Sequence, residues 1–281
     1  CRWMETPKIS CRWTPSLFAG WRRWSLLIFI SLLLFFIASR VPLFSVENNP
    51  ALQAWESFYL DQGENPEKRW PEADIQGLTF DQQAILKVRT TYDRADQSDV
   101  APNTLNSLRR IAGITTHMAE GYVVVAQLLL LFLLSRMIPS WKSLQKPVLG
   151  ALLGAVTAGV AVQGLKILIG RGRPNEMIYR AWPDWQPFTL EHSHHSLPSG
   201  HSTAAGVMVM MLCVIFPRWS ALWCLMGIWI CATRVLTAEH WPSDTLPGLV
   251  LGGFCAAFWI GKLQPREDLN QSDTSSQRPL E

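Results

Sequence analysis

Three groups of polar residues have side chains suited to acid–base and anion chemistry. They are Lys166-x6-Arg173-Pro174, Pro198-Ser199-Gly200-His201 and Arg234-x5-His240-x3-Asp244. Lysine and arginine bind the oxygen atoms of an anion such as phosphate. A glycine lets such an anion approach the free N–H groups at the start of a helix. Two histidines suit a nucleophile and a general acid, because imidazole exchanges protons near neutral pH. The sequence therefore predicts a site for phosphoryl chemistry.

The spacing in the third group predicts a paired histidine and carboxylate. Asp244 follows His240 by four residues, and Pro242 favours a helix that begins between them. A carboxylate in the first turn of that helix can hold one ring N–H of the imidazole. The other ring nitrogen is then free to attack an electrophile.

The three groups resemble the signatures of the type 2 phosphatidic acid phosphatase superfamily, in the same order and with the same internal spacing. Thr233 stands before Arg234 where the family usually has serine, and it keeps a hydroxyl. The resemblance covers about residues 115–262, and the N-terminal 114 residues carry no motif.

The resemblance implies a function for each residue of the three groups. His240 would attack phosphorus and form a phosphohistidine, Asp244 would orient His240, and His201 would protonate the leaving oxygen. The residues implied in binding the phosphoryl oxygens are Lys166, Arg173, Ser199, Gly200 and Arg234. The family needs neither a metal nor a cofactor.

The resemblance also implies the substrate class, which is a membrane lipid carrying a phosphate monoester or a diphosphate. Candidates are undecaprenyl diphosphate, phosphatidylglycerol phosphate, phosphatidic acid and lipid A phosphate. Two alternatives stay open: a lipid phosphotransferase that uses the same phosphohistidine, and a non-enzymatic anion transporter.

Six runs without charged residues predict the elements that position these groups. The runs are 24–39, 121–135, 147–165, 202–217, 219–233 and 245–261. Each is slightly shorter than the ~20 residues that cross a bilayer. Six such runs in one chain argue against buried helices of a soluble protein. We expect an all-α integral membrane bundle of six transmembrane helices, with an extracytoplasmic insertion between the first two.

Basic residues between the runs orient the predicted bundle. They gather before the first run, in the loop after the second, between the fourth and fifth, and after the sixth. The positive-inside rule assigns these positions to the cytoplasm. Both termini are then cytoplasmic, and the three polar groups face the periplasm. Together with the family resemblance, this topology predicts a bacterial inner membrane protein.

The predicted organisation divides the chain into five parts. They are a cytoplasmic segment (1–23), a first transmembrane helix (24–39), an extracytoplasmic segment (40–117), a phosphatase core with five transmembrane helices (118–262) and a disordered cytoplasmic tail (263–281). Short helices are predicted near 50–59 and 80–94. The first run also fits a signal peptide after Arg22 and Arg23, but no small-residue cleavage pattern follows it directly, so we predict a retained helix. Met4 is a candidate start.

Composition excludes other protein classes. The net charge of +3 does not support nucleic-acid binding by bulk charge. Four of the six cysteines lie inside apolar runs, which does not fit a disulfide scaffold. The expected partners are thus the bilayer and a lipid phosphate, with the oligomeric state left open.

Several further residues invite a functional interpretation. Glu191, His192, His194 and His195 are a weak metal signal, and we expect a loop near the substrate entrance or in solvent instead. Arg171 is a candidate contact for the lipid head group. Glycines in the third and sixth runs predict close helix packing; they are Gly150, Gly154, Gly159, Gly164, Gly252 and Gly253.

Overall fold

The computed structural model describes residues 80–97, 103–174 and 185–263. The predicted first transmembrane helix (24–39), the helical piece near 50–59 and the tail from residue 264 lie outside these residues. The described residues are helical, apart from loops and one isolated β-bridge between Arg171 and Trp185.

Among the described residues, five helices form a bundle, and two helices precede it. The bundle helices are α5 (Gly121–Met137), α6 (Gln145–Ile169), α8 (Gly200–Ile215), α9 (Ser220–Leu236) and α10 (Pro242–Leu263). The preceding helices are α3 (Phe80–Gln97) and α4 (Asn103–His117), and short 3-10 turns occupy Pro139–Leu144, His192–His194 and Pro217–Trp219. Each predicted run from 121 onward therefore coincides with a helix, as does the predicted helix near 80–94.

The number of membrane spans is smaller among the described residues than the six predicted. Three segments are long and apolar enough to cross a membrane: Pro139–Ile169, Pro217–Leu236 and Pro242–Leu263. The last part of α4 (Arg110–His117) and α5 together make a fourth candidate, bent by 50°. Helix α8 has only 16 residues, about 24 Å at 1.5 Å per residue, which is less than a ~30 Å hydrocarbon core. The all-α bundle is confirmed. The described residues contain three candidate spans, or four if the bent pair is one span, so the predicted number of six is not shown.

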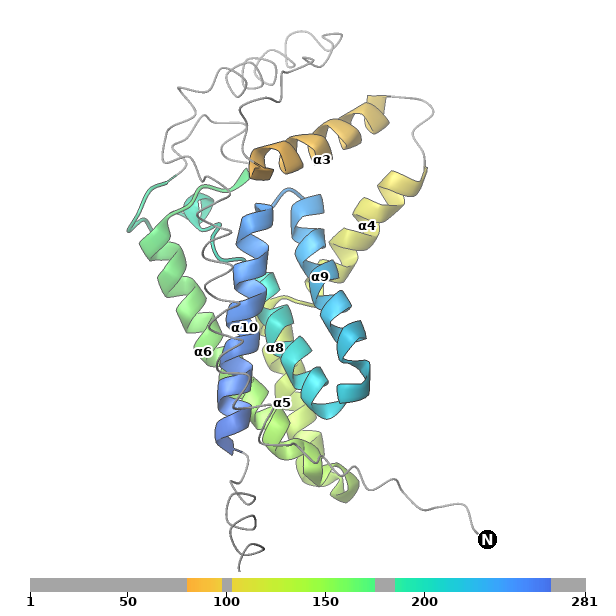
Figure 1. Ribbon diagram of the computed structural model, residues 1–281, viewed down its shortest axis with the longest axis vertical. Helices are drawn as coiled ribbons and strands as arrows, with labels where there is room; N and C mark the ends of the chain where they lie inside the picture. The colour runs from red at the N-terminus through yellow and green to blue at the C-terminus, as the bar shows by residue number, and fades with distance from the viewer. Residues whose placement is uncertain (1–79, 98–102, 175–184, 264–281) are drawn as a thin grey trace, which may run out of the picture.

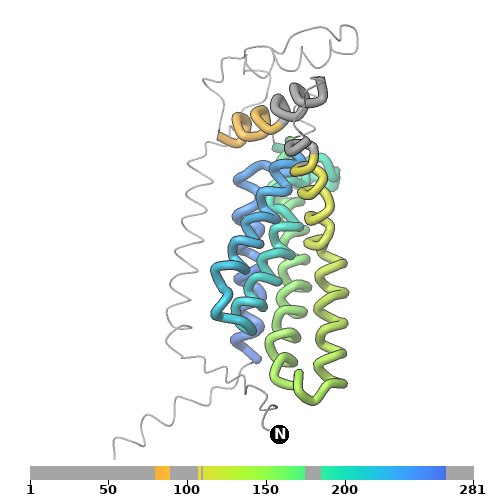
Figure 2. Tube along the Cα trace, turned by 90° about the vertical axis from the view of Figure 1, so that its right-hand side faces the viewer, coloured from red at the N-terminus to blue at the C-terminus, as the bar shows by residue number. Residues whose placement is uncertain are grey.

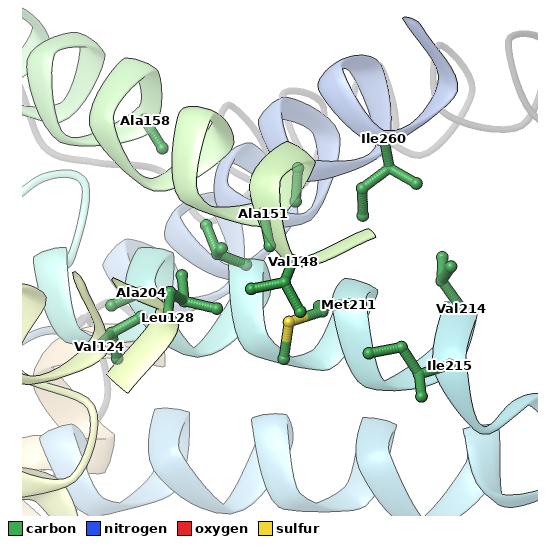
Figure 3. Close-up of a cluster of buried hydrophobic side chains, with 12 residues drawn as sticks. Val124, Leu128, Val148, Ala151, Ala158, Ala204, Met211, Val214, Ile215 and Ile260 are labelled. Atoms are coloured by element: carbon green, nitrogen blue, oxygen red, sulfur yellow. The ribbon is translucent and has the colours of Figure 1, made fainter. Parts of the chain in front are cut away.

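Helix α8 lies among the other helices of the bundle. It packs against α5, α6, α9 and α10, and Figures 1 and 2 show the bundle helices running alongside one another. Its buried side chains join a core with those of α5, α6 and α10. Figure 3 shows Val148 of α6 beside Met211 of α8 in this core.

Glycines bring α10 into close contact with both α6 and α8. A Cβ atom on Gly154 would lie 2.5 Å from the Cα of Ala256, and one on Gly252 would lie 1.8 Å from the carbonyl oxygen of Thr203. The predicted close packing is confirmed at these positions and at Gly150. It is wrong for Gly159 and Gly164, because a Cβ there would meet no atom within 4 Å. A Cβ atom on Gly253 would make only an ordinary van der Waals contact, 3.7 Å from the carbonyl oxygen of Gly206.

The two ends of the bundle differ in character. Figure 1 shows α3 lying across the end at which α6 and α9 finish and α8 and α10 begin. The turns that join α5 to α6 and α8 to α9 lie at the opposite end, with the basic residues Arg136, Lys142 and Arg218 in or beside them. Large apolar side chains between the two ends are exposed on the outside of the bundle, as a lipid-facing surface requires; examples are Leu130, Val160, Leu225 and Phe258.

Candidate active site

The three polar groups of the sequence meet at the end of the bundle covered by α3. The backbone N–H of Ser199 donates to the carbonyl oxygen of Asp244 at 3.0 Å, which joins the second group to the third. Arg171, within the first group, donates from Nη1 to Asp244 Oδ1 at 2.5 Å. Segments that are separate in sequence are thus joined by direct hydrogen bonds.

The second group forms the start of α8. Ser199 is the N-cap residue, with extended backbone angles, and its side chain accepts from the N–H of Ser202. Gly200 and His201 follow in the first turn. A Cβ atom on Gly200 would lie 3.8 Å from Lys166 Nζ. The amino end of α8 and the lysine ammonium therefore lie close together, and both favour an anion.

The first group is positioned by the end of α6. Lys166 lies in the last turn of that helix and is 9% exposed. Gly170 ends α6 in the left-handed conformation (φ 61°), and its N–H donates to the carbonyl of Lys166 at 2.9 Å. A side chain at position 170 would also collide with the carbonyl oxygen of Gln186, 1.8 Å from an added Cβ. Glycine is therefore needed for the turn that leads to Arg171 and Arg173.

The third group places the imidazole of His240 beside the carboxylate of Asp244. Pro242 begins α10 and Asp244 lies in its first turn, as predicted. His240 Nδ1 lies 3.7 Å from Asp244 Oδ2 and 3.5 Å from Ser196 Oγ, and Ser196 in turn donates to Asp244 Oδ2. The Nδ1 edge of the ring thus faces the carboxylate. The Nε2 atom is left as the nitrogen available to a substrate.

Burial controls the protonation of His240. The side chain is 2% exposed, and its desolvation lowers the pKa to about 4 against the opposing effect of Asp244. The positive charges of Arg173 and Arg234 act in the same direction as burial. His240 is therefore a neutral imidazole near neutral pH, the state that a nucleophile requires.

Two arginines of the predicted phosphate site share a carboxylate that the sequence did not single out. Arg173 Nη1 donates to Glu239 Oε2 at 3.0 Å, and Arg234 Nη2 lies 3.9 Å from the same oxygen. Arg234 also donates from Nη1 to Thr116 Oγ1 at 2.9 Å. Glu239 precedes the candidate nucleophile directly, and an acid at that position has no distinctive spacing of its own.

Comparison with known families identifies part of the chain. The sequence profile of the PAP2 superfamily matches residues 147–267. These residues belong to the PAP2 superfamily. The prediction of the family from the three motifs is thus confirmed, and we call residues 147–267 the PAP2 domain.

Three proteins that are similar to part of this chain are named as lipid phosphatases. Lipid A 1-phosphatase of Rhizobium etli is 35% identical over 99 residues, which cover 35% of this chain and 43% of that protein. Lipid A 1-phosphatase of Rhizobium johnstonii is 34% identical over 99 residues, covering 35% and 41%. Lipid phosphate phosphatase 1 of Arabidopsis thaliana is 29% identical over 157 residues, covering 43% and 46%. The matches thus span less than half of each relative, and no solved structure matches the chain.

Arg171 of the PAP2 domain is not a head-group contact, which corrects the expectation from sequence. It is 5% exposed, and its guanidinium bonds to Asp81, Ser243 and Asp244. Its Cζ also lies 5.3 Å from the ring centroid of Trp241. Arg171 is therefore enclosed behind the His240–Asp244 pair, where a lipid does not reach it.

The loop that carries His192, His194 and His195 lies beside the site, and the three side chains have different partners. His192 Nε2 lies 3.1 Å from Arg173 Nη2, and the positive charge of Arg173 lowers the pKa of His192. His194 is buried, and His195 Nε2 lies 3.0 Å from the carbonyl oxygen of Thr189. Among residues 80–97, 103–174 and 185–263, no three His, Cys, Asp or Glu side chains are arranged to hold a metal ion.

A cavity of about 240 Å³ adjoins the site between α5, α6 and α8. Lys166, Gly200 and His201 line it together with apolar residues. Those apolar residues are Val124, Val125, Ala155, Ala158, Val162, Ala204 and Val207. The cavity therefore joins a cationic, histidine-bearing region to an apolar passage within the bundle.

Proposed function

We propose that the protein is a membrane phosphatase that hydrolyses a lipid-linked phosphate monoester or diphosphate through a phosphohistidine intermediate. The observation that carries the proposal is the buried, neutral His240 with its Nδ1 edge toward Asp244, on the same end of the bundle as Lys166 and His201. Membership of the PAP2 superfamily and the printed names of the relatives support a lipid phosphate as the substrate.

In the first step, Nε2 of His240 attacks phosphorus while the bond from phosphorus to the leaving oxygen breaks. Burial and the charge of Arg234 lower the pKa of His201 to about 3 before a substrate binds, and the negative charge of a bound phosphate raises it again. His201 then carries the proton that it donates to the leaving oxygen, so the lipid product leaves uncharged at the broken bond. Asp244 stabilises the positive charge that develops on the His240 ring as the P–N bond forms.

The phosphoryl oxygens gain negative charge in the transition state and need donors that are already in place. Lys166, Arg173 and Arg234 supply positive charge, and the Ser199 hydroxyl and the N–H groups around Gly200 supply neutral donors. Arg234 supports this function further: it is 7% exposed, and its Nε has no hydrogen-bond partner among the described residues. A buried donor of this kind is costly unless an acceptor arrives.

In the second step, water attacks phosphorus on the phosphohistidine and the P–N bond breaks. The electron pair of that bond returns to Nε2 of His240, and the proton of the water passes to His201. Inorganic phosphate is released whether the substrate is a monoester or a diphosphate attacked at its terminal phosphorus, and both histidines return to their starting states.

The apolar cavity supports a substrate whose chain stays within the bundle. A phosphate near Lys166 and His201 would have its lipid chain between α5, α6 and α8. The names of the two bacterial relatives make lipid A phosphate the first substrate to test. The positive-inside pattern supports a reaction on the periplasmic face of a bacterial inner membrane.

The test is phosphate release by the purified, detergent-solubilised full chain with EDTA present. Lipid A, undecaprenyl diphosphate, phosphatidylglycerol phosphate and phosphatidic acid are offered side by side, with His240→Ala as the control. We expect release that survives EDTA and is lost in the variant. The absence of release from all four lipids by folded protein would overturn the proposal.

The two alternatives give different results in the same assay. A phosphotransferase would produce phosphorylated acceptor when a lipid or sugar alcohol is added, with little free phosphate. An anion transporter would bind inorganic phosphate without turnover, and it would tolerate His240→Ala.

A further inference from the structure

A carboxylate from outside the PAP2 domain reaches the buried side of the candidate active site. Asp81 lies in the first turn of α3 and is only 2% exposed. Its Oδ2 accepts from Arg171 Nη2 at 2.9 Å, and its Oδ1 accepts from the backbone N–H of Ser243 at 3.1 Å. The hydroxyl of Ser243 also donates to Asp81 Oδ2. Both carboxylate oxygens of Asp81 are therefore used by residues next to the catalytic pair.

Arg171 connects Asp81 to Asp244. While Nη2 contacts Asp81, Nη1 donates to Asp244 Oδ1 at 2.5 Å and to Ser243 Oγ at 2.7 Å. Arg171, Ser243 and Asp244 are buried, as Asp81 is. The result is a continuous hydrogen-bonded path from α3, through one guanidinium, to the carboxylate that faces His240.

We propose that Asp81 is a positioning residue for the nucleophile, acting on Asp244 and thereby on His240 through Arg171 and Ser243. This inference rests on the proposed function, because it assigns to Asp81 a contribution to the same reaction. Asp81 does not touch the substrate.

The charges explain why a second carboxylate is useful. One guanidinium between two carboxylates leaves a net charge of −1 in the cluster. Without Asp81, the guanidinium would neutralise Asp244 alone in a poorly hydrated region. The imidazolium formed when His240 bonds to phosphorus would then lose its counter-charge. Asp81 thus keeps the negative charge of Asp244 available to His240.

The backbone contact gives Asp81 a second effect. The N–H of Ser243 lies in the first turn of α10, where N–H groups have no partner within the helix. Asp81 accepts from this N–H and fixes the turn that carries Asp244. Carboxylates near helix N-termini are also favoured by the helix dipole.

Anchoring of α3 alone does not account for these contacts. Ile85 is fully buried and Leu86 is 5% exposed on the same helix, so apolar packing already holds α3 on the bundle. A buried ion pair often stabilises no more than apolar residues of similar size would. The placement of Asp81 against Arg171 and Ser243 is better explained by its effect on Asp244.

The experiment compares Asp81→Asn with Ile85→Ala in the full chain. Asp81→Asn keeps the size of the side chain and removes its charge, whereas Ile85→Ala weakens the packing of α3 without touching the polar path. We expect Asp81→Asn to lower kcat about tenfold to a hundredfold, the loss typical of a carboxylate that orients a functional histidine, with KM changed less than about threefold. Ile85→Ala is expected to lower the melting temperature at least as much and to keep kcat within about threefold.

A second readout does not need turnover. Vanadate adopts the five-coordinate geometry of phosphoryl transfer, and its binding to each purified variant is measured by calorimetry. We expect Asp81→Asn to weaken vanadate binding about tenfold or more and Ile85→Ala to leave it near the wild-type value. Ser243→Ala, which keeps both carboxylates, is expected to show a smaller loss of vanadate affinity. This variant replaces Asp81→Asn in the comparison if Asp81→Asn does not fold.

The outcomes separate the two proposals. Equal losses of kcat and of vanadate affinity in Asp81→Asn and Ile85→Ala would show that Asp81 only anchors α3, which overturns the inference. If wild-type protein turns over no lipid phosphate, the proposed function fails, and the vanadate comparison still decides the inference: a selective loss in Asp81→Asn supports it, while equal losses or no binding by the wild type overturn it.

Discussion

The hydroxyl of Ser196 donates a hydrogen bond to Oδ2 of Asp244 at 2.5 Å. The same oxygen accepts from the backbone N–H of Trp241 at 3.1 Å and lies 3.7 Å from Nδ1 of His240. Two fixed donors therefore hold the carboxylate in place before a substrate arrives. The imidazole needs only a small movement to complete its own hydrogen bond, and such tightening on substrate binding is common at catalytic sites.

Replacement of Ser196 is expected to slow the reaction without preventing folding. Ser196→Ala removes one hydrogen bond to a charged group, worth about 1.5 kcal/mol, so kcat/KM should fall about tenfold. The measurement is initial-rate kinetics on the substrate that the wild type hydrolyses best. Ser202→Ala is the matched control, because Ser202 is also a fully buried serine and makes no side-chain hydrogen bond to His240 or Asp244 in the described structure. Equal losses in the two variants would argue against this function of Ser196.

The pH dependence of kcat/KM should report the low pKa of His240. Only neutral imidazole can attack phosphorus, and the pKa of His240 is lowered to about 4. Its neutral fraction, and with it the rate, therefore falls only as the pH drops through that region, well below the ~6.5 of an ordinary histidine. An acidic limb at 6.5 or above that is assigned to His240 would contradict this expectation.

Arg173→Gln tests the cause of that shift. Removal of a nearby positive charge raises the pKa of His240, so the acidic limb should move to higher pH. Arg218→Gln, at the opposite end of the bundle, should leave the limb unchanged. All variants are compared on one substrate. Ionisation of that substrate therefore affects every pH profile equally and does not change the difference between them.

Glu239→Gln is expected to tighten the binding of inorganic phosphate. The Glu239 carboxylate lies 3.0 Å from Arg173 and 3.9 Å from Arg234, where it competes with an incoming anion. Removal of a partly exposed competitor of this kind should lower the inhibition constant for phosphate about two- to fivefold. Glu191→Gln, whose side chain is 61% exposed, is the control. Weaker phosphate binding by Glu239→Gln would show instead that Glu239 holds the arginines in a binding geometry.

The contact between α8 and α10 predicts a stability effect. In Gly252→Ala, the new Cβ would lie 1.8 Å from the carbonyl oxygen of Thr203, so the helices must separate. We expect a loss of about 1–3 kcal/mol, visible as a lower melting temperature in detergent. Gly164→Ala should be neutral or slightly stabilising, because that Cβ meets nothing within 4 Å and alanine favours helix. A melting temperature for Gly252→Ala equal to that of the wild type would contradict this close contact.

Local signals explain how much of the site could be predicted from the sequence. Ser199 caps α8, Gly170 ends α6 and Pro242 begins α10, and each has its effect within a few residues of its own position. These signals fix the helix ends. The spacing of the motif residues was therefore sufficient to predict that His240, Asp244 and Lys166 lie at the same end of the bundle. The apolar runs predicted the helices because they, too, are a signal contained within one stretch of sequence.

Contacts across long stretches of sequence were not predictable in this way. Arg171 and Asp81 are 90 residues apart, and no periodicity or spacing relates them. From sequence, Arg171 was therefore interpreted as exposed to a head group, whereas its partners enclose it. The length of an apolar run also did not distinguish α8, which is covered by other helices, from the longer helices that face lipid.

Different residues surround the two members of the catalytic machinery. Lys166 and His201 line the cavity, whereas Arg171 lies between Asp244 and Asp81 of α3, beside the ring of Trp241. Under the proposed function, a lipid whose chain occupies this cavity leaves by the route through which the next molecule arrives. Product and substrate then exclude each other, so hydrolysis slows as the surrounding leaflet fills with product, and the composition of the membrane itself regulates the rate.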